Sequence, residues 1–194
     1  KYTAGRFNPL HQLSSQTDAL IEDEDHPRIP LDLESSMPYA PYLLILSEEA
    51  TTPEQVGVSA GHGVAVAEFP TTSEAAEACR ANRIAIIMGA PNLVRGGSHS
   101  GNVAASDLAE RDLLDILSSD YVPAALLLSA VQLGEMWGDM ARGMATVTRT
   151  PAQSVGLTDR GRIEVGLRAD LVRFAQIEGA AVAREVFSLG RQVA

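Results

Sequence analysis

Four short apolar runs, separated by segments that begin like helices, place the strongest constraint on how this chain can fold. The runs are residues 43–46, 64–67, 84–88 and 116–119. Each is short enough to be a buried strand, and the segments between them are long enough to hold a helix. Strands that alternate with helices are typical of βα units around a parallel sheet. The sequence therefore predicts an α/β protein with four βα units, half of an eight-stranded (β/α)8 TIM-type barrel.

The segments between the runs carry recognisable helix starts. Residues 51–54, Thr-Thr-Pro-Glu, combine a hydroxyl cap, a proline in the first turn and an acid close behind. Residues 71–74, Thr-Thr-Ser-Glu, repeat this pattern and predict an alanine-rich helix to about residue 82. Ser106 is expected to cap a short helix over residues 107–111, and Pro123 is expected to start a long helix to about residue 142.

Composition and pattern divide the chain into three parts. Residues 1–42 hold an acidic run and five prolines without a helical or strand period, so they are expected to be irregular. Residues 43–155 hold the βα units. Residues 156–194 are expected to be turn-separated short strands, over about 156–163, 166–172 and 182–191, that form a small C-terminal β-subdomain.

Charge and composition exclude several classes of function. The 194-residue chain has a net charge of −10, so it lacks the basic footprint of a nucleic-acid-binding protein. It has no apolar run as long as the roughly 20 residues of a membrane span. Its one cysteine, Cys79, excludes an intrachain disulfide and a cysteine-based metal site, and it suits a reducing cytoplasm.

The stretch from residue 84 to residue 123 concentrates the polar groups that could carry chemistry. An apolar strand is followed by residues 89–102, Gly-Ala-Pro-Asn-Leu-Val-Arg-Gly-Gly-Ser-His-Ser-Gly-Asn. This segment is expected to be a long polar loop. The next apolar strand delivers Asp120 at its carboxyl end, where active sites of parallel α/β folds collect. Glycines, hydroxyls, an arginine and a histidine suit an anionic, oxygen-rich ligand.

Residues 89–102 together with 117–123, Leu-Ser-Ser-Asp-Tyr-Val-Pro, resemble the amidohydrolase-superfamily diphosphatases of the carbon–phosphorus lyase pathway. The resemblance covers residues 51–194, including residues 68–72 and the tail 161–172. It implies the C-terminal half of an amidohydrolase-type barrel. It also implies cleavage of ribose 1-methylphosphonate 5-triphosphate to the 5-monophosphate and pyrophosphate in phosphonate catabolism, with a divalent zinc, manganese or iron ion as cofactor.

The resemblance implies that Asp120 binds the metal and takes a proton from the attacking water, a role that a strand-end carboxylate can perform. A helix-capping role is the alternative for Asp120. The metal-binding His-x-Asp motif of the family is absent, and a His-Asp-Asp run of the family is replaced by Ser47, Glu48 and Glu49, whose carboxylates are candidate substitute ligands. The expected substrate-binding residues all lie in the polar stretch: Asn92, Arg95, Gly96, Gly97, Ser98, His99, Ser100 and Asn102.

Two alternatives to the diphosphatase remain open at this point. One is a non-catalytic half-barrel that binds a phosphorylated ligand or a partner subunit, as the missing histidine motif favours. The other is an amide or cyclic-imide amidohydrolase, which would keep Asp120 but has no use for the polar loop. Because a half-barrel leaves sheet edges unpaired, we expect self-association or a longer chain.

Overall fold

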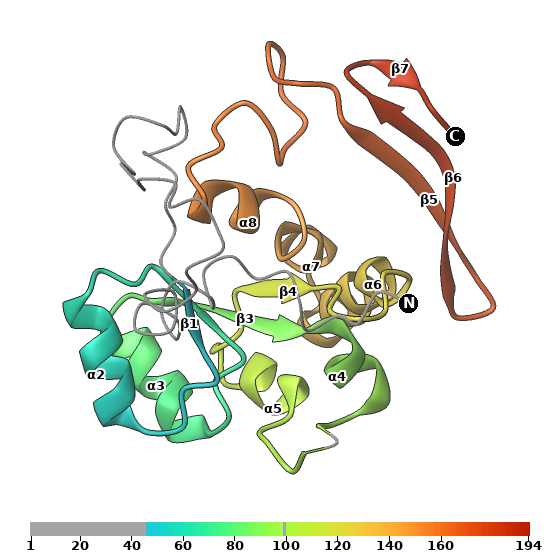
Figure 1. Ribbon diagram of the computed structural model, residues 1–194. Helices are drawn as coiled ribbons and strands as arrows, with labels where there is room; N and C mark the ends of the chain where they lie inside the picture. The colour runs from blue at the N-terminus through green and yellow to red at the C-terminus, as the bar shows by residue number, and fades with distance from the viewer. Residues whose placement is uncertain (1–45, 99) are drawn as a thin grey trace, which may run out of the picture.

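A computed structural model describes residues 46–98 and 100–194. Its parallel sheet has four strands, β1 (Leu46–Glu48), β2 (Val66–Glu68), β3 (Ala85–Gly89) and β4 (Ile116–Ser118). They lie side by side in the order of the chain (Figure 1). A barrel has this sequential order, whereas a doubly wound sheet reverses its order at a switch point. The prediction of an α/β fold with part of a barrel is confirmed.

Helices α2 (Pro53–Gly61) and α3 (Ser73–Ala81) begin where the hydroxyl patterns predict. The Thr52 side chain accepts a hydrogen bond from the Gln55 backbone N–H, and the Gln55 side chain accepts one from the Thr52 N–H, a complete capping box. The Thr72 hydroxyl accepts a hydrogen bond from the Ala75 N–H at 3.1 Å. Each of these two helices is therefore fixed at its start by a threonine that lies four residues after the end of the preceding strand.

Three of the helices that pack on the parallel sheet share the same type of C-terminal end. After α2, α3 and α5 (Ala105–Glu110), the backbone N–H groups of Val64, Ile84 and Leu113 donate to carbonyls five residues earlier, at 3.1, 2.9 and 2.8 Å. This is the Schellman arrangement, in which an apolar residue follows the left-handed turn. All three apolar residues are buried. These three residues anchor the end of each helix in the core, just before the strand that follows it.

The hydrophobic core lies between the parallel sheet and the helices that cover it. Strand residues Ala67, Ile86 and Leu117 are at most 4% exposed, and they belong to one cluster with apolar side chains from the helices. The buried residues of the core cluster include Val56, Ala75, Ala76, Cys79, Ile84, Met88, Leu108, Leu113, Leu114 and Leu133. Burial of apolar area contributes ~25 cal/mol per Å² removed from water, so burial of this layer is the main stabilising contribution to the fold.

The expected polar loop over residues 89–102 contains a helix, so that expectation was wrong in its first half. Helix α4 (Ala90–Arg95) begins directly at the end of β3. Pro91 lies in its first turn, and Gly96 closes it with a left-handed backbone, φ 74°. The expected cap Ser106 was also wrong, because α5 begins at Ala105, two residues earlier than expected, and follows Ala104.

The long helix expected from Pro123 to residue 142 is two helices, α6 (Ala125–Trp137) and α7 (Met140–Ala145). Gly138 ends α6 in the left-handed conformation, φ 63°, and the Asp139 side chain accepts a hydrogen bond from the Arg142 N–H to start α7. A glycine followed by an N-cap residue divides the apolar pattern here. Helix α8 (Arg149–Ser154) follows.

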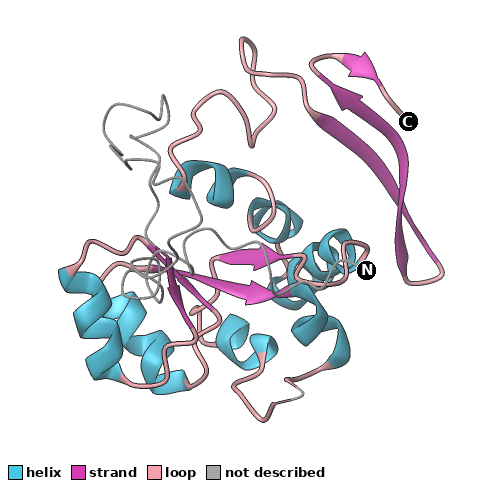
Figure 2. Cartoon of the chain, viewed as in Figure 1, coloured by secondary structure: helices cyan, strands magenta, loops and turns pink. Residues whose placement is uncertain are grey.

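The tail contains a three-stranded antiparallel sheet of β5 (Leu171–Ile177), β6 (Ala180–Ser188) and β7 (Arg191–Gln192). Figure 2 shows residues 156–170 as loop, so the short strands expected over 156–163 and in most of 166–172 were wrong. This loop is held by its own contacts, because the Arg168 N–H donates to the Asp159 carbonyl at 2.8 Å. The division into domains at residues 42 and 155 remains a prediction.

The sequence interpretations of residues 1–42 and of the start of the first strand, residues 43–45, lie outside the described residues. In the described part of the chain, no helix has the length and apolarity that crossing a membrane requires.

Candidate functional site

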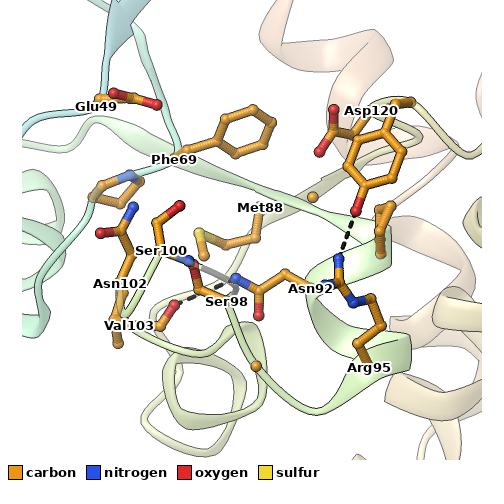
Figure 3. A pocket seen from close by; sticks show the side chains of 15 residues that line it. Glu49, Phe69, Met88, Asn92, Arg95, Ser98, Ser100, Asn102, Val103 and Asp120 are labelled. Carbon is orange, nitrogen blue, oxygen red and sulfur yellow. Dashed lines mark hydrogen bonds between the residues drawn. The ribbon is translucent and has the colours of Figure 1, made fainter.

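The carboxyl ends of the four parallel strands open into one pocket of about 150 Å³ (Figure 3). The described residues that line the pocket are Glu49, Phe69, Pro70, Met88, Gly89, Pro91, Asn92, Arg95, Gly97, Ser98, Ser100, Asn102, Val103, Asp120 and Tyr121.

Asp120 lies at the centre of the chemistry that the sequence predicts. It follows β4 in a left-handed conformation, φ 50°, and its backbone N–H donates to the Ser118 hydroxyl at 3.2 Å. The carboxylate is exposed at the pocket and has no hydrogen-bond donor among the described residues. Helix α6 begins after Ala124 without a side-chain cap, so the capping alternative for Asp120 was wrong.

Gly89 makes room for the Asp120 carboxylate. A Cβ atom at position 89 would lie 3.2 Å from Asp120 Oδ2 and 3.7 Å from Phe69 Cε1. Gly89 itself has an ordinary φ of −71°, so the close approach of the neighbouring side chains is what this position requires. The last residue of β3 thus determines how deep Asp120 and Phe69 can lie over the sheet edge.

Three of the pocket side chains come from left-handed residues at strand ends. Glu49, Phe69 and Asp120 follow β1, β2 and β4 with φ values of 48°, 53° and 50°. Such a conformation costs a non-glycine residue roughly 1–2 kcal/mol, and it is concentrated at functional sites. Figure 3 shows the Phe69 ring between Glu49 and Asp120. The same backbone turn at three strand ends therefore brings two carboxylates and one aromatic ring to one pocket.

Asn92 lines the pocket, but its amide is engaged in holding the polar segment together. Its Oδ1 accepts a hydrogen bond from the Ala105 N–H at 2.9 Å, and its Nδ2 donates to the Val103 carbonyl at 3.4 Å. These bonds supply a side-chain acceptor at the start of α5, which has no cap of its own. Asn92 therefore connects α4 to α5, and a contact with substrate would be an additional role.

The other predicted binding residues are arranged around the same cavity. Gly97, Ser98, Ser100 and Asn102 line it, and the Ser98 hydroxyl accepts a hydrogen bond from the Ser100 N–H at 3.1 Å. Gly96 lies just outside the lining, where it ends α4. His99 lies outside the described residues. The structure thus brings six of the eight expected residues to one pocket together with Asp120: Asn92, Arg95, Gly97, Ser98, Ser100 and Asn102.

Phe69 and Tyr121 are among the pocket side chains that were not expected as site residues, although each was close to an expected feature. Phe69 lies in the quoted 68–72 stretch, and Tyr121 directly follows Asp120. The Arg95 Nη1 donates to the Tyr121 hydroxyl at 2.6 Å, shown as a dashed line in Figure 3. Sequence reasoning missed Phe69 because an aromatic residue after an apolar strand is most simply a core residue.

The described residues supply an incomplete set of metal ligands. Among them, no group of three histidine, cysteine, aspartate or glutamate side chains comes together. Asp120 and Glu49 are carboxylates that face the pocket, and a divalent metal centre needs at least one further donor in addition to water. On these residues alone, the predicted metal does not have a complete site.

Comparison with known proteins shows that the chain is similar to part of a known hydrolase. No family model matches it. It is 44% identical over 170 residues to the alpha-D-ribose 1-methylphosphonate 5-triphosphate diphosphatase of Escherichia coli (strain K12). That match covers 81% of this chain and 45% of the relative, so the chain spans about half the length of the curated relative it matches.

Solved structures agree on the fold. An amidohydrolase from Thermotoga maritima MSB8 aligns with a TM-score of 0.59 at 20% identity, covering 78% of this chain and 43% of that structure. Molinate hydrolase aligns with a TM-score of 0.56 at 13% identity, covering 77% of this chain and 42% of that structure. At these identities the likeness is one of fold.

Proposed function

Because the chain is a homologue of the alpha-D-ribose 1-methylphosphonate 5-triphosphate diphosphatase and has the fold of amidohydrolases, we propose that it forms the C-terminal part of a hydrolase active site. The reaction we assign is cleavage of the phosphoanhydride bond in a ribose 5-triphosphate, which gives the 5-monophosphate and pyrophosphate in phosphonate catabolism. The phosphorylated small molecule is the partner, and we expect neither nucleic acid nor membrane as one.

The observation that carries this proposal is that Asp120 and the polar residues Asn92, Arg95, Ser98, Ser100 and Asn102 line one pocket. The Asp120 carboxylate is a base that can accept a proton from water as the water oxygen bonds to phosphorus. Arg95, Ser98 and Ser100 carry N–H and O–H groups that suit the phosphoryl oxygens. As the new P–O bond forms, the anhydride P–O bond breaks and the electron pair leaves with pyrophosphate.

The proposal includes a divalent metal ion, which would be zinc, manganese or iron. Asp120 would be one of its ligands, and the metal would supply positive charge for the phosphoryl oxygens. The described residues do not complete its coordination. Arg95, Ser98 and Ser100 would contact the phosphoryl oxygens with their own N–H and O–H groups.

The test is pyrophosphate release from a ribose 5-triphosphate by the chain reconstituted with zinc or manganese. We expect Asp120→Asn to lower the rate by about 100-fold or more, the scale of losing a general base, without a change in melting temperature. Asparagine tolerates the left-handed backbone at this position. Glu178→Gln is the matched control, because Glu178 has the same φ of 50° but lies in the β5–β6 turn.

Bound metal per chain, measured by elemental analysis, gives a second readout. Metal that is present in the wild type and lost in Asp120→Asn would support Asp120 as a ligand. Equal rates of pyrophosphate release in the wild type and in Asp120→Asn would overturn the assignment of Asp120.

A second candidate function is non-catalytic binding of a phosphorylated ligand. The incomplete set of metal ligands among the described residues favours it. It predicts that inorganic triphosphate binds but that no pyrophosphate is released under any metal loading. The amide or cyclic-imide alternative is not favoured, since hydrolysis of an amide bond does not itself require an anion site such as the arginine and the serines that line this pocket.

We place the protein in the cytoplasm. Cys79, the single cysteine of the chain, is fully buried, and burial raises the pKa of its thiol. A buried neutral thiol is protected from oxidation and needs no disulfide partner.

A further inference from the structure

The contact between Arg95 and Tyr121 joins two neighbouring βα units at the pocket. Arg95 lies in the last turn of α4, which follows β3, and Tyr121 lies just beyond β4. The distance of 2.6 Å from Arg95 Nη1 to the Tyr121 hydroxyl is at the short end for an N–H···O bond, as a charged donor makes it. Figure 3 shows Arg95 on the same side of the pocket as Asp120, and Tyr121 lines the same pocket.

The direction of the Arg95 guanidinium controls how the pocket attracts an anion. Of the described residues that line the pocket, Arg95 is the single cation, and Glu49 and Asp120 are acids. The whole chain carries a net charge of −10, so its overall field repels a polyphosphate. Attraction must therefore come from a local cation that is correctly oriented.

An arginine at an exposed position is a flexible group. Its side chain has about 2 kcal/mol of rotamer entropy, part of which is lost when the guanidinium is fixed on a ligand. A hydrogen bond that fixes the guanidinium in the free protein reduces this cost at the moment of binding. Tyr121 suits that role, because a tyrosine has only two side-chain torsions and Tyr121 lies in a turn closed by the Val122 N–H and the Ser119 carbonyl at 3.0 Å.

The chemistry of the acceptor matters as well. The phenol oxygen is neutral, so this contact orients the guanidinium without cancelling its charge. A carboxylate in the same place would hold the arginine but would neutralise it as a binding group for phosphate.

We propose that Tyr121 is a positioning residue that holds the Arg95 guanidinium toward the pocket, so that it binds a diphosphate or triphosphate group of the ligand. This inference rests on the proposed function and adds a specificity-determining pair to it. Tyr121 acts through Arg95, and no proton transfer is assigned to it.

The test is calorimetric binding of inorganic pyrophosphate at low salt to the full chain. Tyr121→Phe removes only the hydroxyl, and it is expected to weaken binding by about three- to tenfold, the scale of one hydrogen bond. Arg95→Gln is expected to weaken binding more. The double variant should bind as Arg95→Gln does, because the hydroxyl has no arginine left to orient.

A second measurement does not require a ligand. In ¹⁵N relaxation of the arginine Nε–H groups, the Arg95 signal is assigned by its loss in Arg95→Gln. This signal should be less ordered in Tyr121→Phe than in the wild type. A tyrosine that only packs against its neighbours would leave this order unchanged.

The outcomes separate the two levels of the argument. If the wild type does not bind pyrophosphate, the anion site is wrong and this inference is overturned with it. If the wild type binds, but Tyr121→Phe binds equally well and leaves Arg95 equally ordered, only the role of Tyr121 is wrong. If Tyr121→Phe weakens pyrophosphate binding equally in the wild-type and the Arg95→Gln backgrounds, the positioning role of Tyr121 is also overturned.

Discussion

At the scale of single residues, left-handed backbone occurs in two settings that have different meanings. At the carboxyl ends of strands it presents Glu49, Phe69 and Asp120 to the pocket. At the ends of helices it closes the Schellman turns, where Arg83 follows α3 with a φ of 59° and Gly63 follows α2 with a φ of 75°. Only glycine adopts this conformation without cost, so Arg83 carries a strain with no link to the pocket.

Replacing Arg83 by glycine is therefore expected to stabilise the protein. Relief of the left-handed strain, partly offset by the greater freedom of glycine in the unfolded chain, should raise the free energy of unfolding by about 0.5–1 kcal/mol. Urea denaturation measures this change. Arg83→Ala is the matched control, because it removes the same side chain but keeps the strain. A glycine variant no more stable than the alanine variant would contradict the argument.

The residues of the site could be predicted where their chemical type was informative. A lone aspartate after an apolar strand and a run of hydroxyls and glycines indicate an anion site, and the structure brings Asp120 and most of that run together. Phe69 and Tyr121 could not be predicted in this way, since their directions depend on the backbone turns after β2 and β4. The structural role of the Asn92 amide could not be predicted either, because its hydrogen-bond partners lie 11 and 13 residues away in the sequence.

At the scale of elements, the strand positions and the two capped helices followed directly from local sequence. Helix α4 was missed, although its sequence has a proline in the first turn and a glycine just beyond the end, as helices often do. The density of polar and small residues after it favoured a loop. The break between α6 and α7 was missed because the apolar spacing continues across Gly138, whereas the chain turns there to pack one helix against the other.

The crossing of α6 and α7 depends on a glycine with no room for a side chain. A Cβ atom at Gly143 would lie 2.4 Å from the Ala130 carbonyl oxygen and 2.5 Å from the Gly134 backbone nitrogen. Both neighbours are backbone atoms, so neither can move aside like a flexible side chain. Gly143→Ala is expected to force the helices apart and to cost about 1–3 kcal/mol or more of unfolding free energy, which thermal or urea denaturation measures.

Gly57→Ala is the matched control for that variant. Gly57 is an exposed residue inside α2 with no atom within 4 Å of its Cβ position, so alanine there should stabilise the helix by roughly 0.5–1 kcal/mol. The same substitution thus has opposite signs at the two sites. A Gly143→Ala protein as stable as the wild type would show that the helices do not cross as closely as described.

At the scale of the whole molecule, the chain presents sheet edges and apolar groups that a closed barrel and its subdomain would cover. In the described residues, β5 is an outer strand of the antiparallel sheet (Figure 1). A hydrogen bond from Gln176 Nε2 to Glu135 Oε1 at 2.8 Å connects this sheet to helix α6. Val172 is 54% exposed on that strand. Local sequence predicted a β-rich tail, but which faces stay uncovered is a property of the assembled chain.

An outer strand with unpaired backbone groups and exposed apolar side chains is a template for pairing with another copy. We therefore expect the chain to self-associate at micromolar concentration, with dimers or larger species in light scattering. Val172→Lys should shift the population toward monomer, because a lysine on an edge strand opposes edge-to-edge pairing. Val58→Lys, at a 64% exposed valine on α2, is the control and should leave association unchanged. A monodisperse wild-type monomer, or equal suppression by both variants, would show that this edge does not drive association.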